Sequence, residues 1–154
     1  WCQLGYPSEQ YETHRQAAPQ TTLTEFNNLV LVNQVVANLE SKNFTILDAR
    51  SNDRFHGQNE TLDPVAGHIP GALNRFFKDN LKSDGTFKDP DVLRHEFQSV
   101  IGNISSEKIV HQCGSGITAC HNMFAMELAG LMGSSIYAGS WSEWSSDPSR
   151  PVAQ

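Results

Sequence analysis

The stretch HQCGSGITACHNM, residues 111–123, concentrates side chains that can do chemistry. Cys113 is followed at once by Gly114, Ser115 and Gly116, and then by a predicted helix. Glycines let the backbone curl so that several N–H groups point inward, and such a concave loop beside a helix N-terminus favours anions. Because the thiolate is the nucleophilic form of cysteine, a loop of this kind predicts that Cys113 is a nucleophile. A small buried thiol without reactivity is the alternative.

Other chemistries fit this stretch less well. A P-loop is excluded because no Gly-Lys-Ser/Thr follows the glycines. A cysteine phosphatase holds phosphate with an arginine at the far end of its loop, whereas this loop carries no charged residue. A zinc site is disfavoured because there is no Cys-x-x-Cys pair and the predicted helix would separate the ligands. Those ligands would be His111, Cys113, Cys120 and His121. We therefore expect no metal and no cofactor.

Short apolar runs alternate with helical patterns around this stretch. FTILDA (44–49) and KIVHQ (108–112) are compact and apolar, as buried strands of a parallel sheet are. DPDVLRHEFQSVI (89–101) begins with a capping residue and a proline and then shows helical apolar spacing. TACHNMFAMELAGL (118–131) has apolar residues on several sides, which suits a helix packed on a sheet. The alternation predicts an α/β fold with a mostly parallel central sheet flanked by helices. Ligands bind beyond the carboxyl ends of such strands, where Cys113 falls.

The remaining segments carry weaker patterns. TLTEF (22–26) and LVLV (29–32) are β-prone, and SSIYAGS (134–140) predicts a last strand. NQVVANLESK (33–42) predicts a helix with Asn33 as its N-cap. Its apolar face would be formed by Val35, Val36 and Leu39.

Charge and composition exclude some classes of function. The net charge is −6 and the chain has no basic run, so nucleic-acid binding lacks its electrostatic footprint. The longest apolar-rich stretch, residues 28–39, is interrupted by polar residues and is too short to span a bilayer. Three cysteines without regular spacing argue against a disulfide framework and favour a reducing compartment.

Five motifs follow one another in a recognisable order. They are LDAR (47–50), RFHG (54–57), GHIPGA (67–72), CGSGITA (113–119) and YAGSWSEW (137–144). Together they resemble the rhodanese superfamily, and the uncharged cysteine loop resembles the form found in its 3-mercaptopyruvate sulfurtransferases. Relatives that prefer thiosulfate usually carry basic residues in this loop.

The resemblance implies a rhodanese-like fold and a sulfurtransferase. Cys113 would take a sulfane sulfur from 3-mercaptopyruvate, or from thiosulfate, and hold it as a persulfide. An acceptor thiol such as reduced thioredoxin, or cyanide, would then remove it in a second step. Ser115 would assist proton transfer or bind the departing enolate, and Arg54 would bind the substrate carboxylate. The rest of the predicted substrate-binding loop is Gly114, Gly116, Ile117 and Thr118.

The resemblance also implies a division of the chain. Family enzymes usually have two rhodanese domains in tandem, of which the second carries the cysteine. Residues 21–154 resemble that catalytic domain, and the polar residues 1–20 resemble the end of a linker from an N-terminal partner domain. A cytoplasmic or mitochondrial location follows from the same likeness. The alternatives are a sulfur carrier and a non-catalytic regulatory rhodanese domain.

Several residues near these motifs are given a structural or uncertain role. We expect Asp48 and Arg50 to order nearby loops, and Glu60 and Asp63 to be solvated charges. The family's second substrate arginine has no counterpart in residues 58–66, and Arg75 is the candidate that might replace its charge. Other expectations are a local hydrogen bond for His68, a buried position for Cys120, and either the core or the site wall for Trp141 and Trp144.

Overall fold

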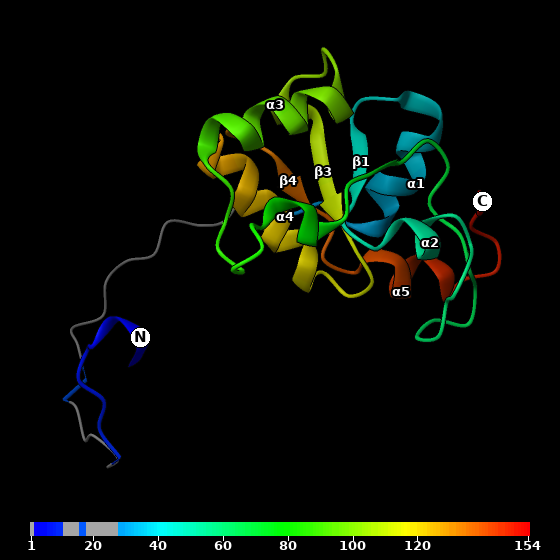
Figure 1. The fold of residues 1–154 in the computed structure, drawn as a ribbon. Helices are drawn as coiled ribbons and strands as arrows, with labels where there is room; N and C mark the ends of the chain where they lie inside the picture. The colour runs from blue at the N-terminus through cyan, green and yellow to red at the C-terminus, as the bar shows by residue number, and fades with distance from the viewer. Residues whose placement is uncertain (1, 11–15, 18–27) are drawn as a thin grey trace.

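A four-stranded parallel sheet forms the centre of the computed structural model, which describes residues 2–10, 16–17 and 28–154 (Figure 1). The strand order is β2-β1-β3-β4, and every pair of neighbouring strands is parallel. The predicted α/β fold with a parallel sheet is thereby confirmed. The strands are β1 (Thr45–Asp48), β2 (Leu73–Asn74), β3 (Ile109–Gln112) and β4 (Ser135–Ile136).

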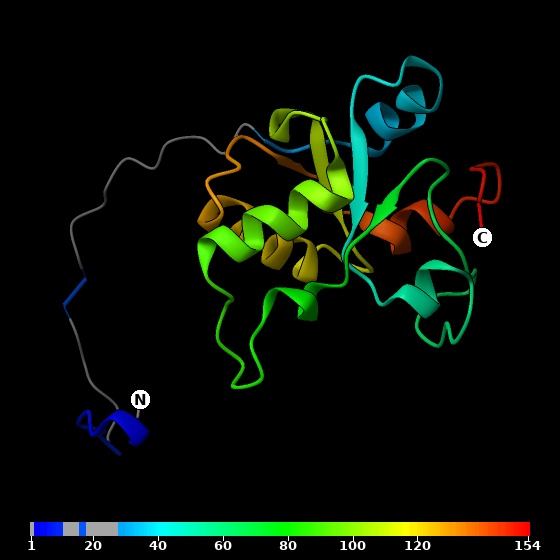
Figure 2. The ribbon, with the colours of Figure 1, turned by 45° about the horizontal axis from the view of Figure 1, so that its top comes forward.

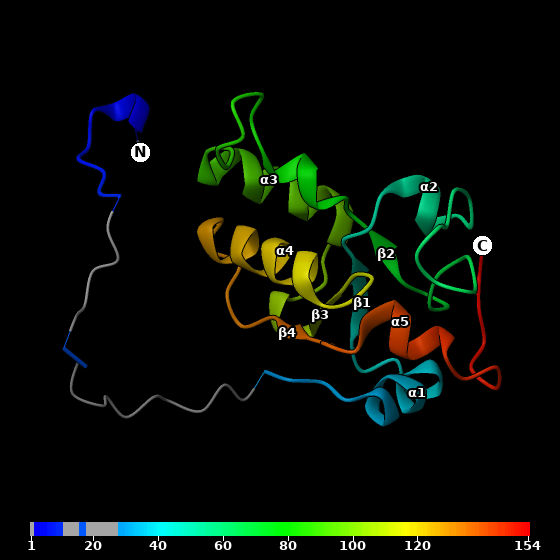
Figure 3. The same ribbon diagram turned by 90° about the horizontal axis from the view of Figure 1, so that it is seen from below.

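Helices cover both faces of this sheet (Figure 3). Alternate residues of a strand point to opposite faces. Leu47 of β1 and Ile109 of β3 therefore join one core cluster, with α3 (Pro90–Ile101) and α4 (Ile117–Leu128). Their neighbours in the strands face α1 and α5 on the other side, and α2 lies beside β2. These three helices are α1 (Val32–Ser41), α2 (Asn52–Phe55) and α5 (Ser140–Ser145).

The helix predicted from residues 89–101 forms as expected. Asp89 is its N-cap and Pro90 its first residue, a position where the missing N–H of proline has no partner to lose. Leu93, Phe97 and Ile101 are buried against the sheet. Figure 2 shows this helix, in green, and the loop before it that projects from the body of the molecule.

The N-terminal part of the body differs from the sequence prediction. Helix α1 begins at Val32 with Leu31 as its cap, so Asn33 is not the N-cap. Val36 is exposed, whereas Asn38 is buried because its amide bonds both backbone groups of Phe44. In the LVLV run, Leu29 forms an isolated bridge with Ile136, and Val32 is already the first residue of α1.

The predicted arm over residues 1–20 lies partly outside the described residues, and the β-prone run 22–26 lies outside them altogether. Residues 2–10 contain a single 3-10 turn, Cys2–Leu4, and are exposed. Two further 3-10 helices are η2 (Phe77–Asn80) and η3 (Ser106–Lys108). In the part of the chain that the structure describes, no helix has the length and apolar character needed to cross a bilayer.

Candidate active site

Cys113 lies where the chain leaves β3, at the carboxyl edge of the sheet. Its side chain is 2% exposed, and the N–H of Gly116 donates a hydrogen bond to Sγ at 3.1 Å. Gly116 has φ +86° and is the N-cap of α4, so the loop of residues 113–116 curls back toward the sulfur. A backbone donor aimed at sulfur at the start of a helix stabilises a thiolate or a persulfide anion.

The two glycines of the 113–116 loop are there for different reasons. A Cβ on Gly116 would lie 2.7 Å from the carbonyl oxygen of Ala138, and its left-handed φ also disfavours a side chain. A Cβ on Gly114 would meet nothing closer than Arg54 Nη2 at 4.0 Å. Position 116 therefore requires glycine, while position 114 has room for a side chain.

The start of α5 fixes the position of the 113–116 loop. The N–H of Cys113 donates to Ser140 Oγ at 3.1 Å, and Ser140 Oγ donates to the carbonyl of Tyr137 at 2.9 Å. The N–H of Trp141 donates to the carbonyl of Cys113, and that of Ser142 donates to the carbonyl of Gly114. Ser140 adopts φ +55°, which lets its hydroxyl and the next two N–H groups face the loop.

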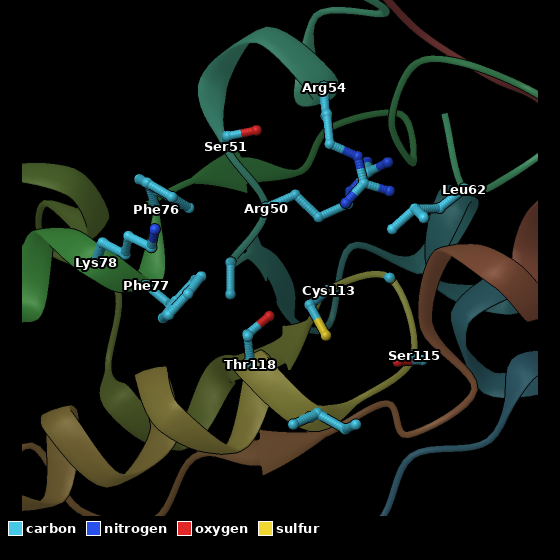
Figure 4. Close-up of a pocket in the computed structure, with 13 residues that line it drawn as sticks. Arg50, Ser51, Arg54, Leu62, Phe76, Phe77, Lys78, Cys113, Ser115 and Thr118 are labelled. Atoms are coloured by element: carbon cyan, nitrogen blue, oxygen red, sulfur yellow. The ribbon is translucent and has the colours of Figure 1, made fainter. Parts of the chain in front are cut away.

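A pocket of about 450 Å³ opens above Cys113 (Figure 4). It lies between the 113–116 loop, the chain that follows β1, and η2. The structure brings together nearly all the residues predicted for the site; Gly116 is buried and faces the sulfur through its N–H instead. The predicted residues that line the pocket are Arg54, Cys113, Gly114, Ser115, Ile117 and Thr118.

Arg54 reaches this pocket from α2 and is paired with carboxylates. Its Nε and Nη2 donate to the two oxygens of Glu60 at 3.0 and 2.8 Å, and Nη2 lies 3.5 Å from Asp63 Oδ2. The side chains of Glu60 and Asp63 are only 3% and 8% exposed. The prediction that both are solvated charges is wrong, because the loop after α2 folds them back onto Arg54.

The environment of Glu60 favours its charged form. Burial alone would raise the pKa of this carboxyl, but hydrogen bonds from Arg54 and from the N–H groups of Leu62 and Asp63 hold the pKa below its usual range. Arg54 is therefore held in a fixed position beside the pocket.

The model of the family described as "Rhodanese-like domain" matches residues 31–147, which include the pocket and every strand of the sheet. The chain belongs to the rhodanese-like domain family.

Relatives of this rhodanese-like domain are longer proteins. A Pseudomonas aeruginosa protein named "Probable 3-mercaptopyruvate sulfurtransferase" is 51% identical over 76% of this chain and 41% of its own length. A thiosulfate sulfurtransferase of Mus musculus is 35% identical over 94% of this chain and 49% of its own length. The solved 3-mercaptopyruvate sulfurtransferase from Leishmania major superimposes with a TM-score of 0.76 at 32% identity, over 94% of this chain and 41% of that one. The chain thus spans less than half the length of these relatives.

Asp48 and Arg50 of the rhodanese-like domain have the structural role expected of them. They form a buried ion pair at 2.7 Å, and Arg50 also donates to the carbonyl of Gly67 at 2.7 Å. The guanidinium lies 4.6 Å from the ring centre of Trp141, which is fully buried. Trp144 is buried in the same core cluster, so both tryptophans belong to the core.

Arg75 does not replace the missing arginine of the pocket. It is buried, pairs with Glu96 at 2.7 Å, donates to Asn80 at 2.8 Å and stacks over Phe97. Lys78 lines the pocket instead. Sequence reasoning missed it, because no motif or spacing in the sequence marks this lysine.

Two further predictions concern residues outside the pocket. His68 donates a hydrogen bond from Nδ1–H to the carbonyl of Phe55 at 2.8 Å and stacks on the Phe55 ring, which is the local role expected. Cys120 is exposed, so its predicted burial is wrong. It lies off the stripe of α4 that carries Ala119 and Asn122 into the interior.

Among the described residues, no three His, Cys, Asp or Glu side chains come together as metal ligands would.

Proposed function

We propose that this rhodanese-like domain is the catalytic part of a sulfurtransferase that uses 3-mercaptopyruvate as its donor. The observation that carries the proposal is the sulfur of Cys113 at the base of a pocket, held by the N–H of Gly116. A structural thiol has no need of a pocket or of a backbone donor aimed at it. The likeness to sulfurtransferases of both donor types supports the same reaction class.

The reaction proceeds in two displacements. The Cys113 thiolate attacks the sulfur of the donor, an S–S bond forms, and the C–S bond breaks with its electron pair going to the pyruvate enolate. The enolate takes the proton that the transferred sulfur carried, and pyruvate leaves. An acceptor thiolate or cyanide then attacks the outer sulfur, the S–S bond breaks, and Cys113 is released as the thiolate.

The loop residues have separate roles in this proposal. The Gly116 N–H stabilises the negative sulfur before and after transfer. Ser115 lines the pocket and donates a hydrogen bond to the departing enolate oxygen, while Gly114, Ile117 and Thr118 shape the wall around the donor. Arg54 binds the donor carboxylate, because a guanidinium matches the two oxygens of that group.

We also propose that residues 21–154 act together with a second rhodanese-like domain, to which residues 1–20 form the linker. The greater length of the relatives supports this arrangement. Leu62 and Ile117 support it as well, because both line the pocket and are more than three-quarters exposed. Apolar side chains at the mouth of a pocket suit a protein surface that closes over it. The proposed acceptor is thioredoxin or another thiol, and the proposed location is the cytoplasm or the mitochondrion.

Mass spectrometry of the Cys113 peptide tests the sulfurtransferase proposal. The protein is incubated with 3-mercaptopyruvate or with thiosulfate, digested without reductant and compared with a sample treated with dithiothreitol. We expect the peptide to gain one sulfur atom from 3-mercaptopyruvate and to lose it with the reductant. Cys120→Ser, which alters an exposed thiol outside the pocket, should gain sulfur at Cys113 as the unmodified protein does. Absence of the gain with both donors would overturn the proposal.

A further inference from the structure

The cations that line the pocket differ in how they are paired. Arg50 is neutralised by Asp48 in a buried pair, and Arg54 faces both Glu60 and Asp63. The wall around Arg54 therefore carries more negative than positive charge. An anionic donor approaching Cys113 on this side meets an arginine whose charge is already compensated, so the pocket needs another cation to attract it.

Lys78 is a cation without such a partner. Among the residues that the structure describes, no carboxylate lies within ion-pairing distance of its Nζ. The ammonium group lies over the ring of Phe76, with Nζ 6.0 Å from the ring centre. Figure 4 shows Lys78 beside Phe76 and Phe77 on one side of the pocket, with Arg54 on the other side and Cys113 between them.

The backbone that carries Lys78 is firmly held. The N–H of Phe77 donates to the carbonyl of Ala49, which ties η2 to the chain leaving β1. Asn80 is fully buried, and its side chain bonds Arg75 at 2.8 Å and Asn122 at 2.7 Å. The base of the lysine side chain is thus fixed at the pocket wall, while its ammonium group stays free to meet a ligand.

We propose that Lys78 supplies the positive charge that draws the anionic sulfur donor into the pocket and selects for donors that carry a carboxylate or a sulfonate. This inference rests on the proposed sulfurtransferase function and adds a specificity-determining residue to it. Lys78 supplies the uncompensated positive charge of the pocket, opposite the compensated charge of Arg54. Its role is to bind and orient the donor, so it contributes to donor affinity more than to the displacement at sulfur.

Alkylation of Cys113 tests the charge of the pocket without any sulfur transfer. Iodoacetate is anionic and iodoacetamide neutral, and with each reagent the thiolate attacks the CH2 carbon, an S–C bond forms and iodide leaves. Mass spectrometry of the Cys113 peptide follows both reactions. The rate with iodoacetate divided by the rate with iodoacetamide is independent of changes in thiol reactivity, because such changes affect both rates equally. Lys78→Gln should lower this ratio roughly three- to tenfold, and Lys78→Arg should keep it. The loss should shrink at high salt.

Lys82→Gln is the matched control, because Lys82 follows closely in sequence but pairs with Asp89 at 2.9 Å and does not line the pocket. An unchanged ratio in Lys78→Gln would overturn the proposal, and so would an equal fall in Lys82→Gln. In steady-state transfer, Lys78→Gln should raise the donor KM about fivefold with kcat nearly unchanged; a loss confined to kcat would also contradict it. If the unmodified protein transfers no sulfur, the proposed function fails while the alkylation ratio still decides the role of Lys78.

Discussion

At the scale of single residues, the pairing of Arg54 with carboxylates determines how the site can bind a donor. Glu60 fills both donors on one edge of the guanidinium, with bonds of 3.0 and 2.8 Å. Asp63 lies further away, at 3.5 Å from Nη2. A donor carboxylate that binds Arg54 must compete with these two groups. Of the two, Asp63 interacts with Arg54 more weakly.

Asp63→Asn removes one competing charge and keeps a hydrogen bond. Asp63 Oδ1 accepts from the Ser142 hydroxyl at 2.6 Å, and the amide oxygen of asparagine can accept the same bond. We expect the donor KM to fall roughly threefold, in line with the modest energy of a partly exposed ion pair. Arg54→Ala should shift KM in the opposite direction, and steady-state kinetics with 3-mercaptopyruvate measures both. A KM that rises in Asp63→Asn would mean that Asp63 orients Arg54 rather than competing with the donor.

The sequence identified residues whose role depends on their own type and their neighbours in the chain. Cys113, Arg54 and the Asp48–Arg50 pair are of this kind, and all lie where the motifs predicted. The pairing of Glu60 with Arg54 was missed because the fold of an irregular loop decides which carboxylates are buried. Lys78 was missed because its proposed role depends on having no carboxylate partner among the described residues, and no spacing in the sequence reveals that.

At the scale of elements, α5 acts as the support of the catalytic loop. Three donors or acceptors of residues 140–142 bind the backbone of residues 113–114. The same segment reaches the loop after α2, since Ser142 donates to Asp63 and the indole N–H of Trp141 donates to the carbonyl of Val65. One short helix therefore fixes both the cysteine and the loop that holds Arg54.

Replacing Ser140 separates the effect of its hydroxyl from that of its backbone conformation. Ser140→Ala leaves the buried N–H of Cys113 without its acceptor, which should cost roughly 1–3 kcal/mol of stability and slow alkylation of Cys113. Ser140→Gly loses the same bond but accepts φ +55° without strain, so it should be more stable than Ser140→Ala by about 1 kcal/mol. Urea unfolding measures both. Ser146→Ala, at the exposed end of α5, is the control; equal stability of Ser140→Ala and Ser146→Ala would refute this role.

Elements with a strong local signal were predicted well. The strands in 44–49 and 108–112 and the helices in 89–101 and 118–131 are apolar runs or carry caps, and each forms where expected. The β-prone run 29–32 pairs only at Leu29, in a parallel bridge with Ile136 of β4, because the chain enters α1 at Val32. The start of α1 was misplaced because Asn33 is a favourable cap in isolation, whereas the chain enters the helix two residues earlier, with Leu31 as the cap.

At the scale of the whole molecule, a neutral histidine is built into the sheet. His111 lies in β3, is fully buried, and approaches Ser134 Oγ at 3.2 Å through Nε2. Burial lowers the pKa of His111 to about 3. A folded-state pKa below the unfolded value of about 6.5 means that unfolding takes up a proton below pH 6.5. Stability is therefore fully present above that pH and declines as the pH falls toward 3.

Because of His111, the free energy of unfolding should fall by roughly 1.4 kcal/mol for each unit by which the pH drops below about 6. His111→Gln should lower the slope between pH 6 and 5, above the range in which Glu60 and Glu96, with lowered pKa values, take up protons. Burial also lowers the pKa of His121, which leaves a smaller slope in the variant. Chemical denaturation at a series of pH values gives the slope for each protein. His95→Gln, which changes an exposed histidine of α3, should leave it as it is. If the slope in His111→Gln equals that of the unmodified protein, groups other than His111 cause the acid sensitivity.

The two glycines of the 113–116 loop have a consequence for how such domains diversify. Backbone contact with Ala138 closes position 116 to any other residue, whereas position 114 opens toward Arg54 with space for a side chain. Evolution can therefore change the charge above the sulfur at a single codon without rebuilding the fold. A combinatorial library aimed at new donors should randomise position 114 and keep glycine at position 116, because variants with another residue at 116 would fold poorly.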